Sequence, residues 1–140
     1  MCGIAGIIDW TKNLDKDDAV IFKKIQKTLS RRGPDQKGIF IEKSVALIHT
    51  RLSVIDIENG RQPMSLEHQG ERFVMVYNGE LYNTSELRSS LRKLGHIFDG
   101  HSDTEVLLHA YAQWREACVN FLNGIFAFAV WERNGRRLFV

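Results

Sequence analysis

The residue best placed for chemistry is Cys2, directly after the first methionine. Removal of Met1 would give one residue both a thiol and a free α-amine. Peptide-terminal amines have a reference pKa of roughly 7.7–8.0 and free thiols one of about 8.5, so the amine can accept or relay the thiol proton. Cys2 is therefore a candidate nucleophile that carries its own base. These residues alone leave open the alternative that Cys2 is a small apolar residue at a frayed chain end.

A cysteine that attacks an amide also needs hydrogen-bond donors for the oxyanion that forms. A backbone N–H beside an amide side chain is a suitable pair, and Asn78-Gly79 provides it at the end of an expected strand. The competing interpretation is a simple turn, because Asn-Gly is a strong hairpin signal. Taken alone, the dipeptide favours the turn over an oxyanion hole.

An amino-acid substrate needs a cation for its α-carboxylate and an anion for its α-ammonium. Arg51 can supply the cation, since a guanidinium binds a carboxylate with two parallel hydrogen bonds. Asp103 can supply the anion, although a carboxylate in the first turn of a helix also stabilises the helix dipole. Singly, each also fits a solvated surface charge. His49 and His101 are interpreted as structural, because the amine of Cys2 makes a histidine base unnecessary.

The composition indicates one domain without a nucleic-acid or membrane partner. The 140 residues are 44% hydrophobic, which is enough for one core and too little for two ordinary domains. The 19 basic and 17 acidic side chains are well mixed, and the net charge of +2 marks no single-sign face. The N-terminus lacks the basic segment of a secretory signal, and no apolar stretch is long enough to span a membrane.

Cysteine and histidine usage argues against a disulfide or metal framework. The only cysteines are Cys2 and Cys118, and a reducing compartment would keep a reactive thiol free. The 5 histidines are scattered along the chain instead of clustered at ligand spacing. We therefore expect no metal site and a cytoplasmic location.

The elements that must position these residues follow from the apolar periodicity. In the first half, residues 4–8 predict a strand that would hold the N-terminus, and the spacing over about 18–32 predicts a helix. The runs 38–42 and 45–49 predict two antiparallel strands. Residues 50–65 are expected to form a long loop, and long loops inside compact domains are usually functional.

Two helices are expected in the second half. Asn83 with Glu86 has the form of a capping box, and Ser102 with Glu105 repeats the signal. Each pair precedes an apolar pattern at helical spacing. The second helix would carry Asp103 in its first turn.

The remaining strands complete the predicted fold. A strand is expected at 72–77, and the unbroken apolar run 125–131 is typical of a strand buried on both faces. Asn134-Gly135 predicts a hairpin into a last strand over 137–140, where the chain stops. We interpret that end as a truncation. The fold class predicted is α+β, a four-layer αββα sandwich of two mostly antiparallel sheets covered by helices.

Six blocks, taken together and in order, resemble a known family: the class II glutamine amidotransferases, which belong to the N-terminal-nucleophile hydrolases. RLSVID and NGELYN favour the asparagine synthetase branch over the amidotransferases that serve glucosamine phosphate or phosphoribosylamine synthesis. The resemblance covers nearly all 140 residues and is more specific than any single motif. The blocks are MCGIAGI at the start, RRGPDQKG at 31–38, HTRLSVIDIENGRQPM at 49–64, YNGELYN at 77–83, SDTEVLLHAY at 102–111 and FLNGIFAFAVW at 121–131.

The resemblance implies a glutaminase half-reaction at the candidate residues. Cys2, as the first residue, would attack the side-chain amide of L-glutamine and form a thioester. Asn78 and the N–H of Gly79 would form the oxyanion hole. Arg51 would bind the substrate carboxylate, and Asp103 would bind its ammonium. The other residues that would line the pocket are Leu52, Ser53, Val54, Ile55 and Glu80.

The resemblance also implies a missing partner domain. No cofactor is expected in residues 1–140. In the full-length family, ammonia passes to a synthetase domain that uses ATP and magnesium to make asparagine from aspartate. The pyrophosphate-binding loop of that domain is absent from the sequence. Residues 1–140 are therefore expected to be one amidotransferase domain, cut at its C-terminal end, and a homodimer is an assembly that the sequence leaves open.

Three other interpretations stay open at this point. A chain that keeps Met1 would have its amine capped as an amide, and it could be a non-catalytic module that binds glutamine through Arg51 and Asp103. The domain could also serve a different ammonia acceptor, because acceptor specificity is encoded outside these residues. Lastly, the chain could be a fragment with no native function.

Overall fold

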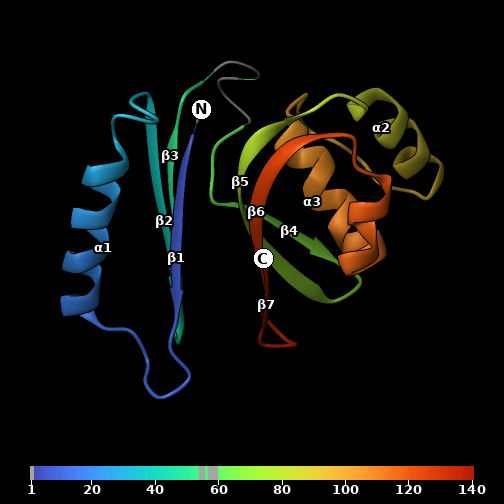
Figure 1. Cartoon of the computed structure of the whole chain (residues 1–140). Coiled ribbons are helices and arrows are strands. Elements are labelled where there is room, and N and C mark those ends of the chain that lie inside the picture. Colours follow the sequence, from blue (N-terminus) through green and yellow to red (C-terminus); the bar gives the residue numbers. More distant parts are fainter. Residues whose placement is uncertain (1, 54–55, 57–59) are drawn as a thin grey trace.

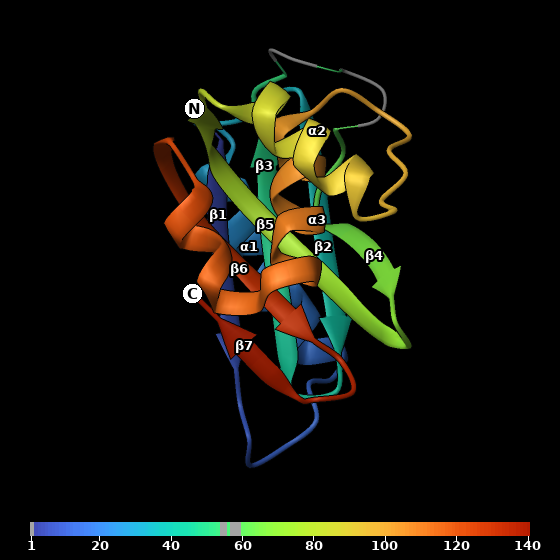
Figure 2. The same ribbon diagram turned by 90° about the vertical axis from the view of Figure 1, so that its right-hand side faces the viewer.

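Two antiparallel sheets pack face to face in the computed structural model. Helix α1 (Lys16–Leu29) covers the outer face of one sheet, and α2 (Thr84–Lys93) and α3 (Asp103–Trp114) cover the outer face of the other. Figure 1 shows the four layers side by side, and Figure 2 shows the face that carries α2 and α3. The predicted α+β sandwich is confirmed. The structure describes residues 2–53, 56 and 60–140.

The first sheet brings the N-terminus to one end of the sandwich. It consists of β1 (Gly3–Ile8), β2 (Gln36–Glu42) and β3 (Val45–Arg51) in the order β1-β3-β2. The central strand β3 is buried along its whole length. Its antiparallel register places Gly3 opposite Thr50, so Cys2 lies beside the last residues of β3. The antiparallel pairing predicted for the two runs after the first helix is confirmed.

Helix α1 begins and ends earlier than the sequence predicted. Asp15 is its N-cap, and the Asp15 carboxylate accepts hydrogen bonds from two backbone N–H groups of the first turn. The carboxylate of Asp18 accepts from the N–H of Asp15, which completes a capping box. The helix ends at Leu29, and the segment after it then presses against β3. A Cβ on Gly33 would lie 2.3 Å from the backbone of Thr50, so only glycine fits there.

The second sheet has the order β4-β5-β6-β7. Its strands are β4 (Met64–His68), β5 (Glu71–Leu81), β6 (Gly124–Glu132) and β7 (Arg137–Phe139). All neighbours pair antiparallel, and the hairpin predicted between the last two strands is confirmed. A 3₁₀ helix, η1 (Arg115–Phe121), connects α3 to β6.

Asn78-Gly79 lies inside β5 instead of forming a turn. β5 continues to Leu81, beyond the predicted end at residue 77, and Gly79 pairs with Phe126 of β6. The two strands approach so closely that a Cβ on Gly79 would lie 2.4 Å from the carbonyl oxygen of Ile125. Glycine is therefore required here by packing against β6, and the turn interpretation is wrong.

The prediction that β6 is buried on both faces is correct only for its second half. Phe128 and Val130 to Glu132 are buried, whereas Ile125 is 72% exposed. Part of β6 also borders an apolar cleft of about 540 Å³ between the two sheets. Ile4 to Ile8 of β1 and Phe126 to Ala129 of β6 form most of its walls.

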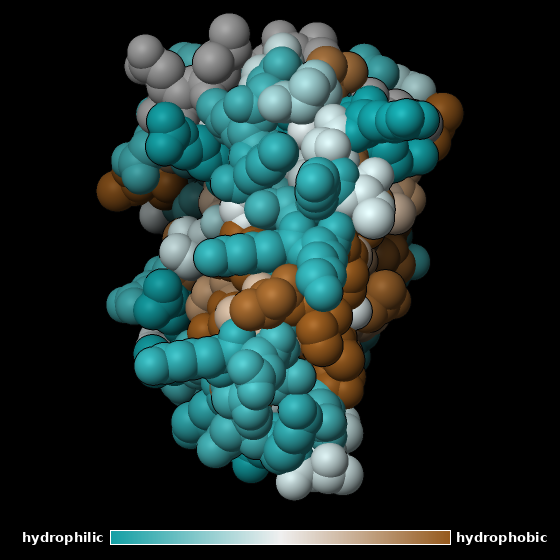
Figure 3. Space-filling view, turned by 90° about the vertical axis from the view of Figure 1, so that its left-hand side faces the viewer, coloured by the Kyte–Doolittle hydropathy of each residue, from teal (hydrophilic) through white to brown (hydrophobic). Residues whose placement is uncertain are grey.

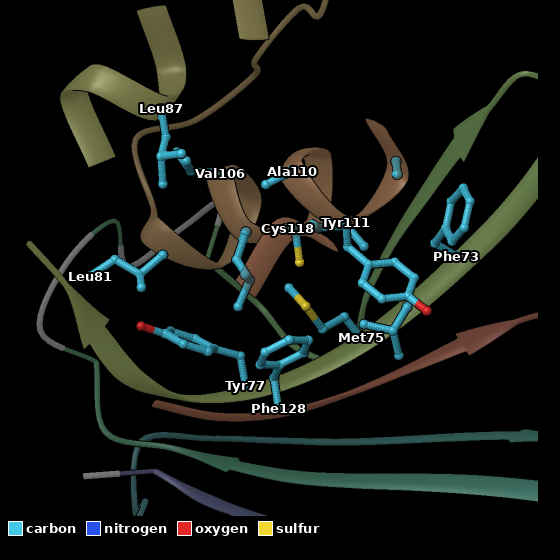
Figure 4. Packing of buried hydrophobic residues seen from close by; sticks show 14 of the residues in the cluster. Phe73, Met75, Tyr77, Leu81, Leu87, Val106, Ala110, Tyr111, Cys118 and Phe128 are labelled. Carbon is cyan, nitrogen blue, oxygen red and sulfur yellow. The ribbon is translucent and has the colours of Figure 1, made fainter. Parts of the chain in front are cut away.

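The larger part of the core lies between the second sheet and α3. Nine residues of α3 are buried, and six of them share one apolar cluster with buried side chains of β5 and β6. Figure 4 shows Met75 and Tyr77 of β5 together with Tyr111 of α3 and Cys118 of η1 in this cluster. The site-bearing strand β5 is thus held rigidly from one side.

The two predicted capping boxes have different outcomes. Ser102 caps α3, since its Oγ accepts a hydrogen bond from the N–H of Glu105 at 3.2 Å. The Glu105 carboxylate instead accepts from two N–H groups of the loop before the helix. The Asn83 box is wrong, because the Asn83 side chain bonds the carbonyl of Phe121 and the N–H of Asn123. It thereby ties α2 to the entry of β6.

The α1 face of the molecule is mostly hydrophilic with an apolar patch. Figure 3 shows hydrophilic side chains over much of this face and a hydrophobic band between them. The exposed apolar residues of α1 and β1 are Val20, Ile21 and Ile7. Among the helices of the described residues, none is long and apolar enough to cross a membrane.

Candidate active site

A pocket of about 320 Å³ lies where the N-terminus, the end of β3, the second half of β5 and the start of α3 meet. Of the ten site residues predicted from sequence, seven line it. Ser53 does not line the pocket, and Val54 and Ile55 lie outside the described residues. The seven are Cys2, Arg51, Leu52, Asn78, Gly79, Glu80 and Asp103.

Cys2 is anchored at the rim by its neighbours in the first sheet. Its Sγ is 3.8 Å from the carbonyl oxygen of Leu52, and its own carbonyl accepts a hydrogen bond from Arg32 Nε at 3.1 Å. Gly3 follows in β1, where a Cβ would lie 2.6 Å from the hydroxyl of Thr50. The thiol is half-buried and unpaired with any other cysteine. It is therefore fixed in place and open to the pocket.

Arg51 is held at the pocket by the loop that follows β3. The side chain is 5% exposed, and it donates to Gln36 Oε1 at 2.8 Å and to the carbonyl of Asp56 at 2.7 Å. A Cβ on Gly60 would lie 2.2 Å from its guanidinium. The Asp56 carboxylate in turn accepts from the N–H of His101 at 2.6 Å. These contacts fix a cation in the wall of the pocket.

The backbone of Ser53 supports the loop beside the pocket. Its N–H donates to Asp35 Oδ2 at 2.7 Å, which ties the loop after β3 to the segment before β2. Sequence reasoning missed the structural roles of Asp35 and Gln36. The sequence signal that could have indicated these roles is the position of both residues in the RRGPDQKG block.

The backbone N–H of Gly79 points into the pocket. Successive residues of an antiparallel strand direct their N–H groups to alternate edges. The N–H of Tyr77 donates to Gln62 Oε1 at 2.6 Å, on the edge away from β6. The N–H of Leu81 points to Asp103 Oδ2 at 3.4 Å on the same edge. Gly79 lies midway between Tyr77 and Leu81, so its N–H points to the same edge of β5. The pairing of β4 with β5 has already ended there.

Asp103 occupies the first turn of α3 and faces β5. Its Oδ1 accepts a hydrogen bond from the N–H of Thr104 at 3.0 Å, and its Oδ2 accepts one from the hydroxyl of Tyr77 at 2.8 Å. Burial, followed by the charge of Asp103, raises the pKa of the Tyr77 phenol far above its usual value. The phenol therefore stays protonated and donates to the carboxylate.

Gln62 is a buried connector that sequence reasoning missed. Its Oε1 accepts from the N–H of Tyr77, and its Nε2 donates to Thr104 Oγ1 at 3.1 Å. The side chain thus replaces the strand partner that β5 loses where β4 ends, and it joins β5 to α3. The sequence signal for Gln62 was its place in the QPM end of the block at 49–64.

The structural interpretation of His49 and His101 fits the geometry. His49 is 1% exposed, and its Nε2 lies 3.2 Å from the carbonyl oxygen of Tyr77. Burial lowers the pKa of His49 to about 4. His101 is exposed and bonds Asp56 through its backbone. Neither side chain lines the pocket.

The other three histidines are not scattered in space as they are in sequence. The Nδ1 atoms of His96 and His109 are 2.8 Å apart, and His68 stacks on His96 with ring centroids 4.6 Å apart. The strand β4 and the helix α3 bring them together. Within the described residues, no group of three or more His, Cys, Asp or Glu is arranged to hold a metal ion.

The pocket therefore combines a thiol, a backbone donor, a cation and an anion. A thiolate can attack a carbonyl carbon, and the N–H of Gly79 with the Asn78 amide can stabilise the resulting oxyanion. Arg51 and Asp103 can hold the carboxylate and ammonium groups of an amino acid. This arrangement suits hydrolysis of a side-chain amide.

Comparison with known proteins agrees with this interpretation of the pocket. Residues 1–140 match the family described as the glutamine amidotransferase domain. The glutamine-hydrolysing asparagine synthetase 3 of Bacillus subtilis (strain 168) is 50% identical over 139 residues, which cover 99% of this chain and 22% of that protein. The probable glutamine-hydrolysing asparagine synthetase of Dictyostelium discoideum is 37% identical, over 95% of this chain and 24% of that protein. The chain spans about a fifth of the length of the curated relatives it matches.

Solved structures are similar in architecture as well. The glutamine phosphoribosylpyrophosphate amidotransferase from B. subtilis matches with a TM-score of 0.55 and 27% sequence identity. The match covers 66% of this chain and 22% of that one. A structure described as the allosteric regulatory enzyme of purine biosynthesis matches with the same TM-score of 0.55.

Proposed function

The chain belongs to the glutamine amidotransferase domain family, and on that premise we propose that it is the glutaminase part of an asparagine synthetase. It hydrolyses the side-chain amide of L-glutamine to glutamate and ammonia. The observation that carries the proposal is that one pocket joins Cys2, Asn78-Gly79, Arg51 and Asp103. These residues are up to 101 positions apart in the sequence, and each has the chemistry that this reaction needs.

The reaction proceeds through a thioester on Cys2. After loss of Met1, the α-amine takes the proton of the thiol, and the sulfur attacks the amide carbon of glutamine. The negative oxygen that forms accepts hydrogen bonds from the N–H of Gly79 and the side chain of Asn78. The amine then gives its proton to the leaving nitrogen, which departs as ammonia. Water attacks the thioester, glutamate leaves, and the thiol regains its proton.

The two charged residues orient the substrate. Arg51 binds the α-carboxylate, and Asp103 binds the α-ammonium across the pocket. Leu52 and Glu80 also line the pocket. Val54 and Ile55 remain predicted pocket residues in the part of the loop that is not described.

Hydrolysis at this site needs no cofactor, because nucleophile, base and oxyanion donors all come from the chain. ATP and magnesium act in a synthetase domain, where ammonia and aspartate give asparagine. The support for such a partner is that the matched relatives are several times longer than residues 1–140. A homodimer remains a prediction that sedimentation of the full-length protein would test.

We place the protein in the cytoplasm. The support is that the two cysteines of the chain are both free, which suits a reducing compartment.

Glutamate release from L-glutamine by Cys2→Ala and Cys118→Ala chains tests the proposal. Cys2→Ala should abolish release. Cys118→Ala should keep it, since burial raises the pKa of the Cys118 thiol to about 12 and leaves it unreactive. Unchanged release by Cys2→Ala would overturn the mechanism.

The non-catalytic alternative gives a different result in the same assay. A module that only binds glutamine would show no release by the unsubstituted chain, yet calorimetry would detect binding of L-glutamine that depends on Arg51 and Asp103. The identity of the ammonia acceptor would need the full-length protein with aspartate and ATP.

A further inference from the structure

Tyr77 has an apolar body in the core and a hydroxyl at the substrate pocket. The residue is 2% exposed and belongs to the cluster between β5 and α3, yet it also lines the pocket. Figure 4 shows its hydroxyl directed away from Tyr111, whose own hydroxyl points to the opposite end of the cluster. The polar end of Tyr77 thus leaves the core on the side of the site.

The backbone of Tyr77 is fixed by the loop before β4 and by the first sheet. Its N–H donates to Gln62 Oε1 at 2.6 Å, and its carbonyl is 3.2 Å from Nε2 of His49 in the first sheet. The ring is then wedged among buried apolar side chains, including Phe128. The position of the hydroxyl is therefore set by the fold before any substrate binds.

Within the part of the chain that the structure describes, this hydroxyl makes the shorter of the two hydrogen bonds to Asp103 Oδ2. The phenol donates at 2.8 Å, whereas the N–H of Leu81 is 3.4 Å away. Among the described residues, the other oxygen, Oδ1, accepts one hydrogen bond, from the N–H of Thr104, the residue directly after Asp103. Without the phenol, the carboxylate keeps one local bond and one long bond. Its side-chain torsions are then less restrained.

We propose that Tyr77 is a positioning residue that holds the Asp103 carboxylate toward the α-ammonium group of the substrate, so that the pocket selects amino-acid amides over amides lacking this group. The inference rests on the proposed function, because glutamine is the ligand concerned. A carboxylate locked by a phenol meets the ammonium without first losing side-chain freedom. Asp103 then binds more tightly than a freely rotating carboxylate would.

Binding to chains that cannot turn over tests this role. In a Cys2→Ala background, Tyr77→Phe removes only the hydroxyl and keeps the ring in the core. NMR titration would give the affinity for L-glutamine and for 4-carbamoylbutanoate, which carries the same amide and carboxylate but no ammonium. We expect Tyr77→Phe to weaken L-glutamine binding roughly tenfold, as for loss of a hydrogen bond to a charged group. The affinity for 4-carbamoylbutanoate should stay unchanged.

Tyr111→Phe is a matched control. Tyr111 is also fully buried in the same cluster, and its hydroxyl donates to a carboxylate, Glu132 Oε1, at 2.6 Å. That pair lies outside the pocket lining. The control should lose stability as Tyr77→Phe does, without a change in affinity for either ligand.

A double-mutant cycle with Asp103→Asn completes the test. Tyr77→Phe should weaken L-glutamine binding less than twofold once Asp103 is neutral, because the phenol acts through that carboxylate. Equal weakening of both ligands by Tyr77→Phe, or a full tenfold loss in the Asp103→Asn background, would overturn the inference. Failure of the Cys2→Ala parent to bind L-glutamine would instead overturn the proposed function and the inference with it.

Discussion

Both halves of β5 pair with β6 along one edge, but their other edges have different neighbours. From Phe73 to Tyr77 the strand is buried, with β6 on one edge. On its other edge, β4 pairs with β5 as far as Met75. From Asn78 to Leu81 the pairing with β6 continues, but that other edge faces the pocket.

The difference shows how one strand supplies both core and site. Where β4 leaves, a backbone edge with unpaired donors would be costly if it were buried without partners. Gln62 and Asp103 satisfy the N–H groups of Tyr77 and Leu81, and the N–H of Gly79 between them is directed into the pocket. The N–H of Gly79 is therefore available as an oxyanion donor because the pairing of β4 with β5 ends before it.

The core half should dominate stability. Phe73 is fully buried, so Phe73→Ala should lower the free energy of unfolding by roughly 3–5 kcal/mol. Denaturant unfolding measures this directly. A loss below about 1 kcal/mol would mean that the core half of β5 is not packed as described.

The site half should dominate turnover. In Gly79→Ala, the new Cβ would lie 2.4 Å from the carbonyl of Ile125, and β5 must move away from β6. Displacing one oxyanion donor should cut glutamate release by roughly a hundredfold to a thousandfold. In the control Gly135→Ala, the nearest atom would be 3.6 Å away, so release should stay near the unsubstituted rate. Equal rates of glutamate release by the two variants would show that Gly79 does not contribute to catalysis.

Two buried histidines, one of them at the junction of the two halves, should make stability depend on pH. Burial lowers the pKa of His49, beneath Tyr77, and of His109 in α3 from 6.5 to about 4. The unfolded chain binds more protons between these values, so stability is full above pH 6.5 and falls as the pH drops toward 4. Each histidine should cost about 1.4 kcal/mol per pH unit in that window.

Unfolding at pH 7.5, 6.5 and 5.5 would measure this slope. His109→Gln should lower the number of protons taken up on unfolding by about one. A slope near zero between pH 6.5 and 5.5 would contradict the burial of these two side chains.

The open half of β6 should tolerate truncation. Phe126 is only half-buried beside the exposed Ile125, so Phe126→Ala should cost roughly 1 kcal/mol. Phe128→Ala, at a 6% exposed position of the same strand, should cost roughly three times as much. Similar losses in the two variants would show that the apolar cleft beside β6 is closed in solution.

Local sequence signals predicted the layers and most strands because apolar periodicity reports burial directly. Five of the seven site residues in the pocket could be predicted from their chemistry, and Leu52 and Glu80 from the family resemblance. The end of β5 could not be predicted, since Asn78-Gly79 favours a turn locally and only close packing against Ile125 overrides that preference.

Supporting residues escaped prediction for a related reason. Gln62, Tyr77 and Gln36 act through contacts with residues 15 or more positions away, and no local pattern encodes those contacts. The histidine cluster was missed in the same way, because His68 lies in β4, His96 after α2 and His109 in α3.

Glutamate release, measured on a sample whose intact mass is recorded at the same time, tests most directly whether Cys2 is an N-terminal nucleophile. Release from L-glutamine should rise in proportion to the fraction of chains that lack Met1, because only those chains carry the amine beside the Cys2 thiol. Full release by chains that all retain Met1, or no release by chains that all begin at Cys2, would contradict this mechanism.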